Sequence, residues 1–198
     1  MEPVGHLVSV NVGRPREAAW AMIGRTSIDK VAVPGRVDVR RLGLAGDEVS
    51  DTRHHGGADQ AVYAFAREDL DRWAEAFGLP VPDGMFGENL TTVGLDVNGA
   101  EIGERWRVGD PTGDHAVLEV TMFRTPCQTF KAWLARNGYD DRAWVRRFAE
   151  DLRPGAYLRV VVPGTVRVGD PIEVVHRPGT DVTVASWFAE VFAPPTRG

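Results

Sequence analysis

The stretch that decides the fold is residues 115–130, HAVLEVTMFRTPCQTF, where one kind of secondary structure gives way to another. Its first nine residues are rich in β-branched and other apolar side chains, which predicts a strand. Thr125 and Gln128 then have the spacing of a capping box, with Pro126 at the first helical position. The pattern predicts a helix that begins at Thr125 as N-cap and holds Cys127 in its first turn.

Short β-rich stretches bounded by Gly, Pro or Asp occur along the whole chain. Besides HAVLEVTMF they are HLVSVNV, GRVDVRRL, QAVYAF, ERWRVGD, AYLRVVV, TVRVGD and PIEVVH. Several such strands at close spacing are typical of a β-barrel or sandwich. Apolar residues at helical spacing predict three helices over 67–78, 126–137 and 140–152, the last capped by Asp140. The predicted fold class is mainly β (α+β), with about three peripheral helices.

Length and composition indicate one globular domain. The chain has 198 residues, 43% of them hydrophobic, and no Pro/Ser/Gly-rich linker long enough to divide it. We therefore expect a single domain over residues 1–180, followed by a C-terminal tail or short helix over 181–198.

Charge and cysteine content limit the function classes. The 23 basic residues comprise 21 Arg and 2 Lys against 28 acidic residues, which argues against a nucleic-acid polymer as partner. The N-terminus MEPVGHL lacks the regions of a signal peptide, one cysteine cannot form an internal disulfide, and no apolar run is long enough for a membrane helix. We expect a cytoplasmic protein without a membrane partner.

Cys127 is the only cysteine of the chain. Unpaired backbone N–H groups and the helix dipole favour a thiolate at a helix N-terminus, and Arg124 adds a positive charge nearby. Such a sulfur can act as a nucleophile, a redox sensor or a soft metal ligand. The alternative is a small, buried apolar side chain, and the local pattern leaves these options open.

A glycine-rich loop at 53–65, RHHGGADQAVYAF, is the second candidate segment. Gly56 and Gly57 allow a turn with exposed backbone N–H groups that suit anionic oxygens. Asp59 is a candidate for orienting a histidine or binding a ligand amine. The alternative is a tight turn with a purely architectural role.

Two histidines of this loop, His54 and His55, are candidates for a general base beside a nucleophilic Cys127. A zinc site built from His54, His55 and Asp59 is a competing hypothesis. It is disfavoured because adjacent side chains in an extended loop point apart and no spaced His or Cys pair completes a tetrahedral set.

A third segment, MFGENLTTVGL at 85–95, contains Gly87, Glu88 and Asn89 between two expected strands. The Asn89 amide offers a donor and an acceptor suited to a heterocycle edge, or it is an ordinary turn residue. Asp47, in GLAGDEVSD, is likewise either a turn cap or a contact for a polar ligand.

The ordered combination of HGG-x-D at 55–59, FGENL at 86–90 and R-x-P-C at 124–127 resembles the MOSC domain family, in particular its YiiM-like branch. The similarity spans most of residues 42–130 and continues more weakly over 155–175. The combination is specific, whereas each motif alone is weak.

This resemblance implies a β-barrel that binds the molybdenum cofactor (molybdopterin), with Cys127 as the thiolate ligand of the metal. Arg124 is expected to hold the phosphate or metal-oxo oxygens, because a guanidinium binds them bidentately. Cys127 and Arg124 are the predicted catalytic residues. The residues assigned to the cofactor pocket are Arg53, His55, Gly56, Gly57, Asp59, Gly87, Glu88, Asn89 and Arg124.

Three functions are compatible with this assignment. The first is a molybdenum-dependent oxidoreductase that reduces N-hydroxylated or N-oxygenated compounds such as hydroxylamino bases. Its electrons would come from a separate reductase, because the sequence has no G-x-G-x-x-G motif and no cysteine cluster. The second is a carrier of the cofactor, or of sulfur on Cys127, without turnover of its own. The third is a hydrolase that uses Cys127 and His55.

The sequence departs from the family pattern at two places. Phe123 stands where many relatives have proline. YiiM-like relatives often continue into a small three-helix module, which we do not expect within residues 181–198.

Overall fold

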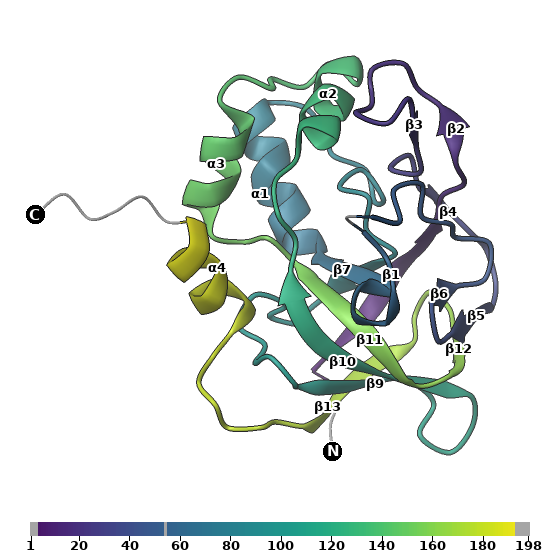
Figure 1. Cartoon of the computed structure of the whole chain (residues 1–198). Helices are drawn as coiled ribbons and strands as arrows, with labels where there is room; N and C mark the ends of the chain where they lie inside the picture. The colour runs from purple at the N-terminus through teal and green to yellow at the C-terminus, as the bar shows by residue number, and fades with distance from the viewer. Residues whose placement is uncertain (1–3, 54, 193–198) are drawn as a thin grey trace, which may run out of the picture.

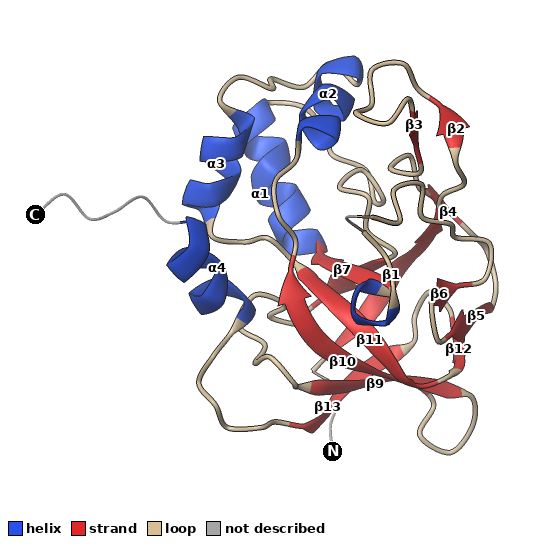
Figure 2. Cartoon of the chain, viewed as in Figure 1, coloured by secondary structure: helices blue, strands red, loops and turns tan. Residues whose placement is uncertain are grey.

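The computed structural model describes residues 4–53 and 55–192, in which strands form a closed barrel and helices gather on one side of it (Figures 1 and 2). The barrel order is β13-β9-β10-β11-β7-β8-β1, and pairing of β1 with β13 closes the ring. These strands are β1 (Gly5–Val12), β7 (Val62–Ala66), β8 (Leu90–Val93), β9 (Arg105–Gly109), β10 (His115–Phe123), β11 (Ala156–Val162) and β13 (Pro171–His176). The predicted mainly β barrel is therefore confirmed.

Shorter strands decorate the barrel. β4 (Val31–Ala32) extends the sheet beyond β1. A three-stranded sheet combines β5 (Val37–Arg40), β6 (Gly43–Leu44) and β12 (Gly164–Val166), and β2 (Arg16–Glu17) pairs with β3 (Arg25–Thr26). No separate strand was predicted for β2, β3, β4 or β6, because two-residue strands carry no periodic signal.

Burial along the strands follows from their neighbours. In β10 the alternate residues Ala116, Leu118 and Val120 are buried, as expected for a strand with one face on the core. In β7 all five residues are buried. A strand covered on both faces loses the alternation, and β7 lies between the barrel interior and the helical layer in Figure 2.

The described residues contain four α-helices and one 3-10 turn. They are α1 (Arg67–Phe77), α2 (Gln128–Arg136), α3 (Trp144–Asp151), α4 (Val184–Phe192) and η1 (Ala58–Gln60). Their apolar faces meet in an aromatic cluster in which Trp144 packs against Trp73, Phe130 and Phe148 at ring-centroid distances of 4.9, 4.9 and 5.3 Å. The three predicted helices are present, and α4 agrees with the second of the two alternatives expected for residues 181–198, a tail or a short helix.

Two predicted helix starts are wrong. α2 begins at Gln128 with Cys127 as N-cap, because Cys127 has an extended backbone and its own Sγ accepts a hydrogen bond from the backbone N–H of Phe130. α3 begins at Trp144 rather than near Asp140, because Ala143 adopts a left-handed conformation with φ 49°. The Asp140 carboxylate instead accepts bonds from the backbone N–H and the guanidinium of Arg142.

Phe123, at the end of β10, has a clear packing role. Its ring contacts three aromatic rings of α4, those of Trp187, Phe188 and Phe192, at centroid distances of 4.9, 5.2 and 5.9 Å. The residue that departs from the family pattern therefore anchors the last described helix to the strand that leads to Cys127.

None of the helices within residues 4–53 and 55–192 combines the length and the apolar character that crossing a bilayer would require.

Replacing Phe148 by Ala tests the helical layer. Its side chain is 2% exposed and packs against Trp73, Trp144 and Phe188. We expect Phe148→Ala to lower the free energy of unfolding by about 3–5 kcal/mol, because a large buried ring leaves a cavity. Val145→Ala, at a 39% exposed position of the same helix, should change it by less than about 1 kcal/mol. Denaturant titration measures both, and equal effects would contradict this account of α3.

Candidate active site

Cys127 lies where β10 passes into α2. Its Sγ accepts a hydrogen bond from the backbone N–H of Phe130 at 3.4 Å, so the sulfur itself caps the helix. The residue is half-buried. A fixed, partly exposed thiol at a helix N-terminus favours a chemical role over that of a purely buried apolar side chain.

Arg124 is buried beside this thiol, with 8% of its surface exposed. Its guanidinium lies over the rings of Phe130 and Tyr63, 4.6 and 5.1 Å from their centroids, and Nη1 donates to the carbonyl of Phe86. Among the described residues no carboxylate pairs with it, and the side chains that interact electrostatically with it include those of Tyr63, Tyr157 and Cys127. A buried cation without a counter-ion is unfavourable, so the site favours an anion.

The loop over residues 84–89 forms the next wall of the site. Gly87 has φ +73°, and a Cβ there would lie 3.2 Å from Cγ1 of Ile28 and 3.5 Å from Nη1 of Arg124. Glycine therefore keeps the space beside the guanidinium open.

The fully buried carboxylate of Glu88 braces this loop. It accepts hydrogen bonds from the backbone N–H of Gly84 at 2.5 Å and of Phe86 at 3.0 Å, and from the hydroxyl of Thr91 at 2.9 Å. Burial penalises the charged form and raises the pKa of Glu88 to about 7, although these hydrogen bonds oppose the shift. The contacts give Glu88 a positioning role, and direct contact with a cofactor stays a prediction.

The side-chain amide of Asn89 likewise forms hydrogen bonds with groups of the protein. Its Oδ1 accepts from the backbone N–H of Tyr63 at 3.1 Å, while Nδ2 donates to Asp47 Oδ2 at 2.9 Å and to the Asn11 carbonyl at 3.2 Å. The amide that was expected to face a heterocycle thus joins β7 to strand β1 and to the loop that holds Asp47. A contact of Asn89 with a cofactor also stays a prediction.

Lys30 is a site residue that the sequence analysis missed. Its Nζ lies 2.5 Å from Asp47 Oδ1, and both side chains are nearly buried. Burial lowers the pKa of Lys30, whereas Asp47 and Glu88 act in the opposite sense. Glu88 and Arg124 both interact electrostatically with Lys30, so Lys30 belongs to the same cluster of charged groups as these two residues. The available signal was its rarity, since only two lysines occur beside 21 arginines.

The glycine-rich loop is attached to the end of β10. Gly56 and Gly57 have φ values of 81° and 79°, which glycine adopts without strain. The N–H of Gly56 donates to the Gln60 side chain, whose Nε2 in turn lies 3.3 Å from the sulfur of Met122. The loop therefore lies against the same strand that leads to Arg124 and Cys127.

Within this loop, Asp59 interacts with groups of the protein itself. Its carboxylate, 61% exposed, forms an ion pair with Arg159 of β11 at 2.7 Å, and its carbonyl accepts from Thr121 at 2.5 Å. Arg159 also binds Glu119 at 2.9 Å. These contacts anchor the loop to the barrel surface, and an interaction of Asp59 with a ligand stays a prediction.

For Arg53 and His55, the other predicted residues of this loop, the hydrogen bonds described involve the backbone N–H groups. The backbone N–H of Arg53 donates to the Asp51 carboxylate, and that of His55 donates to the Asp51 carbonyl. Arg53 is exposed and His55 half-buried. His54 lies outside the described residues. Within those residues, no group of three or more His, Cys, Asp or Glu side chains is arranged to hold a metal ion.

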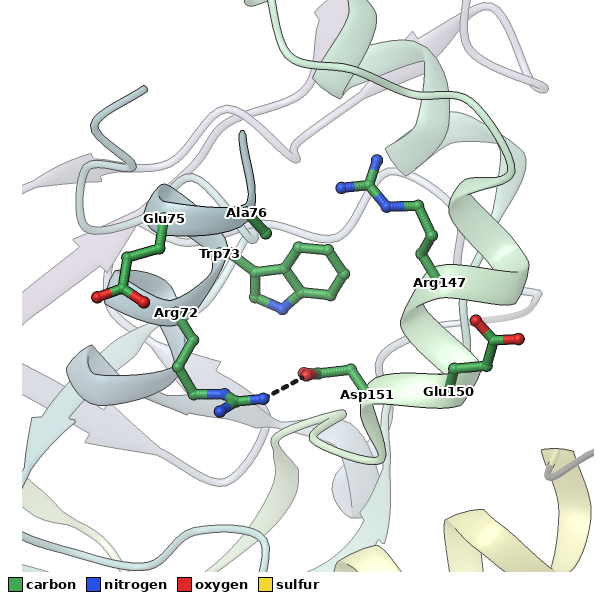
Figure 3. Close-up of a pocket in the computed structure, with 7 residues that line it drawn as sticks. All are labelled: Arg72, Trp73, Glu75, Ala76, Arg147, Glu150 and Asp151. Carbon is green, nitrogen blue, oxygen red and sulfur yellow. Dashed lines mark hydrogen bonds and ion pairs between the residues drawn. The ribbon is translucent and has the colours of Figure 1, made fainter. Parts of the chain in front are cut away.

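A cavity of about 610 Å³ between α1 and α3 contains none of these residues. Figure 3 shows its lining, with Trp73 as the floor and Arg72 paired with Asp151 at 3.0 Å. Arg147 lies on the other side of the indole, 5.6 Å from its ring centroid. Because its cations are engaged by these partners, this cavity offers no counterpart to Arg124.

A model of the MOSC domain matches residues 51–173, which is more than half of the chain. The chain belongs to the MOSC domain family. The matched region contains every predicted site residue from Arg53 to Cys127, whereas Lys30 and Asp47 precede it.

Individual relatives agree with this assignment. The chain is 32% identical to protein YiiM of Escherichia coli over 167 residues, covering 80% of this chain and 67% of YiiM. It is 30% identical to the uncharacterized protein YflK of Bacillus subtilis over 179 residues, covering 90% and 76%. A protein of Gibberella moniliformis named "Reductase" is 29% identical over 88% of this chain, which covers 30% of that longer protein.

Solved structures show the same MOSC fold. The crystal structure of YiiM from Geobacillus stearothermophilus superposes with a TM-score of 0.74 at 25% identity, over 96% of this chain and 84% of the other. That of YiiM from Escherichia coli gives 0.70 at 27% identity, over 98% and 80%.

Glu88 gives this site a pH dependence that stability measurements can detect. Its folded-state pKa of about 7 lies above the ordinary value of 4.5, so the unfolded chain loses this proton first as the pH rises. The stabilisation is complete below about 4.5 and is lost as the pH rises through about 7. The difference in unfolding free energy between wild type and Glu88→Gln should therefore fall by about 3 kcal/mol from pH 4.5 to above 7. A pH-independent difference would contradict this prediction.

Proposed function

We propose that this MOSC protein is a molybdenum cofactor-dependent oxidoreductase that removes oxygen from N-hydroxylated compounds such as hydroxylamino bases. The observation that carries the proposal is the pairing of a half-exposed thiol, Cys127, with a buried guanidinium, Arg124, that has no carboxylate partner among the described residues. A soft sulfur and an uncompensated cation are the two groups that an anionic molybdenum cofactor needs from a protein.

The surrounding residues fit such a group. Cys127 would hold the metal, and Arg124 would bind phosphate or oxo oxygens in the space that Gly87 leaves open. Lys30 adds a second cation, already balanced by Asp47. When bound, the cofactor supplies a metal that changes its oxidation state by two electrons. Reduction of R–NHOH to R–NH2 and water consumes two electrons and two protons.

The proposed reaction needs a source of electrons. The sequence has a single cysteine and no dinucleotide-binding fingerprint, so it offers no iron–sulfur ligands and no Rossmann motif. The printed name of the Gibberella relative, "Reductase", supports a redox role, and the similar region covers 30% of that longer protein. We therefore propose a separate reductase as the partner.

Cys127→Ser tests cofactor binding directly. A serine hydroxyl can still accept the N–H of Phe130, so the helix cap and the fold should persist. Expressed in a bacterial host that makes the cofactor, the wild type should carry molybdenum and a fluorescent oxidised pterin, and the variant should lose most of both. Molybdenum by plasma mass spectrometry and pterin fluorescence give the readout. A wild type that binds neither would overturn the proposal.

Arg124→Lys tests the anion-binding role. Lysine keeps the charge but loses the planar fork, so we expect at least about a tenfold loss in kcat/KM for an N-hydroxylated purine with an artificial electron donor. Arg136→Lys is the matched control, because Arg136 also lies over an aromatic ring, that of Trp20 at 5.5 Å, at the far end of α2. Equal losses in the two variants would show that stacking, not anion binding, is affected.

A second candidate is a carrier of the cofactor, or of sulfur on Cys127. The partial exposure of the thiol favours it, because a carrier must present its cargo to another protein. Intact-mass analysis would show a persulfide on Cys127 without any reduction of N-hydroxylated bases. Turnover by the molybdenum-loaded wild type would exclude a pure carrier.

A further inference from the structure

The turn between β2 and β3 presents an apolar surface beside the thiol-bearing helix. Met22 is 76% exposed, the largest exposed fraction of any large apolar side chain among the described residues, and Ile23 is 46% exposed. The half-buried ring of Trp20 belongs to the same turn. We call Trp20, Met22 and Ile23 the apolar tip. Single exposed apolar residues are ordinary, whereas several at one turn indicate a contact surface.

The apolar tip has an ordered backbone. Across the turn, the backbone N–H of Ala18 donates to the carbonyl of Gly24 at 2.9 Å. Within the turn, Ala21 donates to Ala18 and Gly24 donates to Ala21, each at 2.9 Å. Gly24 has a left-handed conformation with φ 72°, which glycine adopts without strain. Met22 and Ile23 therefore project from a hydrogen-bonded turn, and such preorganisation lowers the entropic cost of binding a partner.

Contacts with α2 place the apolar tip next to the first turn of that helix. The backbone N–H of Met22 donates to the hydroxyl of Thr129 at 3.4 Å, two residues after Cys127. The ring of Trp20 stacks on that of Trp133, with a centroid distance of 6.0 Å and an interplanar angle of 19°. Figure 1 shows the β2–β3 hairpin beside α2. A protein bound to the apolar tip would therefore lie next to the first turn of the helix that Cys127 caps.

The two segments that meet here, residues 13–30 and 124–137, are basic although the chain as a whole is acidic. Together they contain seven Arg or Lys residues and two acidic residues, whereas the whole chain contains 23 and 28. A local excess of positive charge attracts an acidic surface and increases the rate of encounter with it. An isologous contact between two copies of this chain would instead bring two basic faces together. The charge pattern therefore favours an acidic protein as the partner.

Two arginines beside the apolar tip are available to such a partner. Arg25 follows the turn directly as the first residue of β3. Arg136 lies at the end of α2, with its guanidinium 5.5 Å from the centroid of the Trp20 ring. Both side chains are exposed, and neither forms an ion pair with another residue that the structure describes. They therefore offer unpaired positive charge at the edge of an apolar surface.

We propose that the apolar tip, with Arg25 and Arg136, is the docking surface for an acidic electron-transfer protein that delivers electrons to the site at Cys127. This inference rests on the proposed function, for which it specifies the charge of the electron donor and the place where the donor binds. An apolar centre with charged groups at its rim is the usual anatomy of a protein interface. Each conversion of R–NHOH to R–NH2 and water takes two electrons from the partner and two protons from solvent.

Met22→Glu tests this inference with reduced flavodoxin, an acidic protein, as the electron donor. A carboxylate at this exposed position should repel the acidic partner, and we expect kcat/KM for flavodoxin to fall about tenfold or more. Turnover with reduced methyl viologen, a small donor that needs no docking surface, should stay within about twofold of wild type. Leu42→Glu, at a 71% exposed position between β5 and β6, is the matched control and should leave both rates unchanged.

Arg25→Glu tests the charged part of the surface without changing the apolar tip. It should lower kcat/KM for flavodoxin and weaken the dependence of this parameter on ionic strength, because one attractive charge is replaced by a repulsive one. An unchanged kcat/KM for flavodoxin in both Met22→Glu and Arg25→Glu would overturn the docking surface. An equal loss with flavodoxin and methyl viologen would also overturn it, because the substitutions would then act on the thiol site itself.

Binding without turnover separates this inference from the proposed function. On immobilised flavodoxin, biolayer interferometry should show salt-sensitive binding of the wild type and Leu42→Glu, and about tenfold weaker binding of Met22→Glu. If the wild type carries no molybdenum but this pattern holds, the oxidoreductase proposal fails while the docking surface stands. Absence of wild-type binding at low salt would overturn the docking surface. A wild-type dimer that Met22→Glu dissociates in sedimentation velocity would also overturn it, because the surface would then belong to a second copy.

Discussion

The burial of one guanidinium organises the site and much of the structure around it. Arg124 comes from the end of β10, its aromatic partners Tyr63 and Phe130 from β7 and α2, and its carbonyl acceptor Phe86 from the loop before β8. Three stretches that are far apart in the sequence, around residues 63, 86 and 124–130, therefore meet at a single charge. Ring faces and one carbonyl offset part of its desolvation cost, but they supply no negative charge. The fold thus retains an unbalanced cation beside its only thiol, which makes the site receptive to an anionic group.

The residues of the family motifs divide into those that face this cation and those that hold the walls in place. Gly87 faces it, because a side chain there would approach the guanidinium. The polar atoms of Glu88 and Asn89 form hydrogen bonds with backbone groups and with Asp47. The carboxylate of Asp59 forms an ion pair with Arg159. A buried polar group that is fully hydrogen-bonded holds its loop in one position. A ligand site needs such a fixed loop, because a mobile loop would not keep the ligand-binding geometry. Membership of a motif therefore does not by itself indicate contact with a ligand.

Periodic patterns allowed much of the fold to be predicted, and non-local contacts account for what was missed. The strands and the faces of the helices follow from alternating and helical spacing of apolar residues. The helix starts were misplaced because the choice between Thr125 and Cys127 as cap depends on the backbone angles of Cys127, and the start of α3 on the left-handed Ala143. The pairing of Asp59 with Arg159 joins residues 100 positions apart. Lys30 was overlooked for the same reason, since its burial depends on Asp47 and the 84–89 loop.

The two buried cations of the site are not equivalent, and this difference decides where an anion would bind. Lys30 already has a carboxylate at 2.5 Å, so a second anion there would meet the charge of Asp47. Arg124 has no such partner among the described residues, and its planar donors suit phosphate or oxo oxygens. The Lys30–Asp47 pair contributes instead by fixing Asn89 and the backbone of Gly13 through the same carboxylate. The asymmetry leaves one strong anion position, beside the sulfur of Cys127.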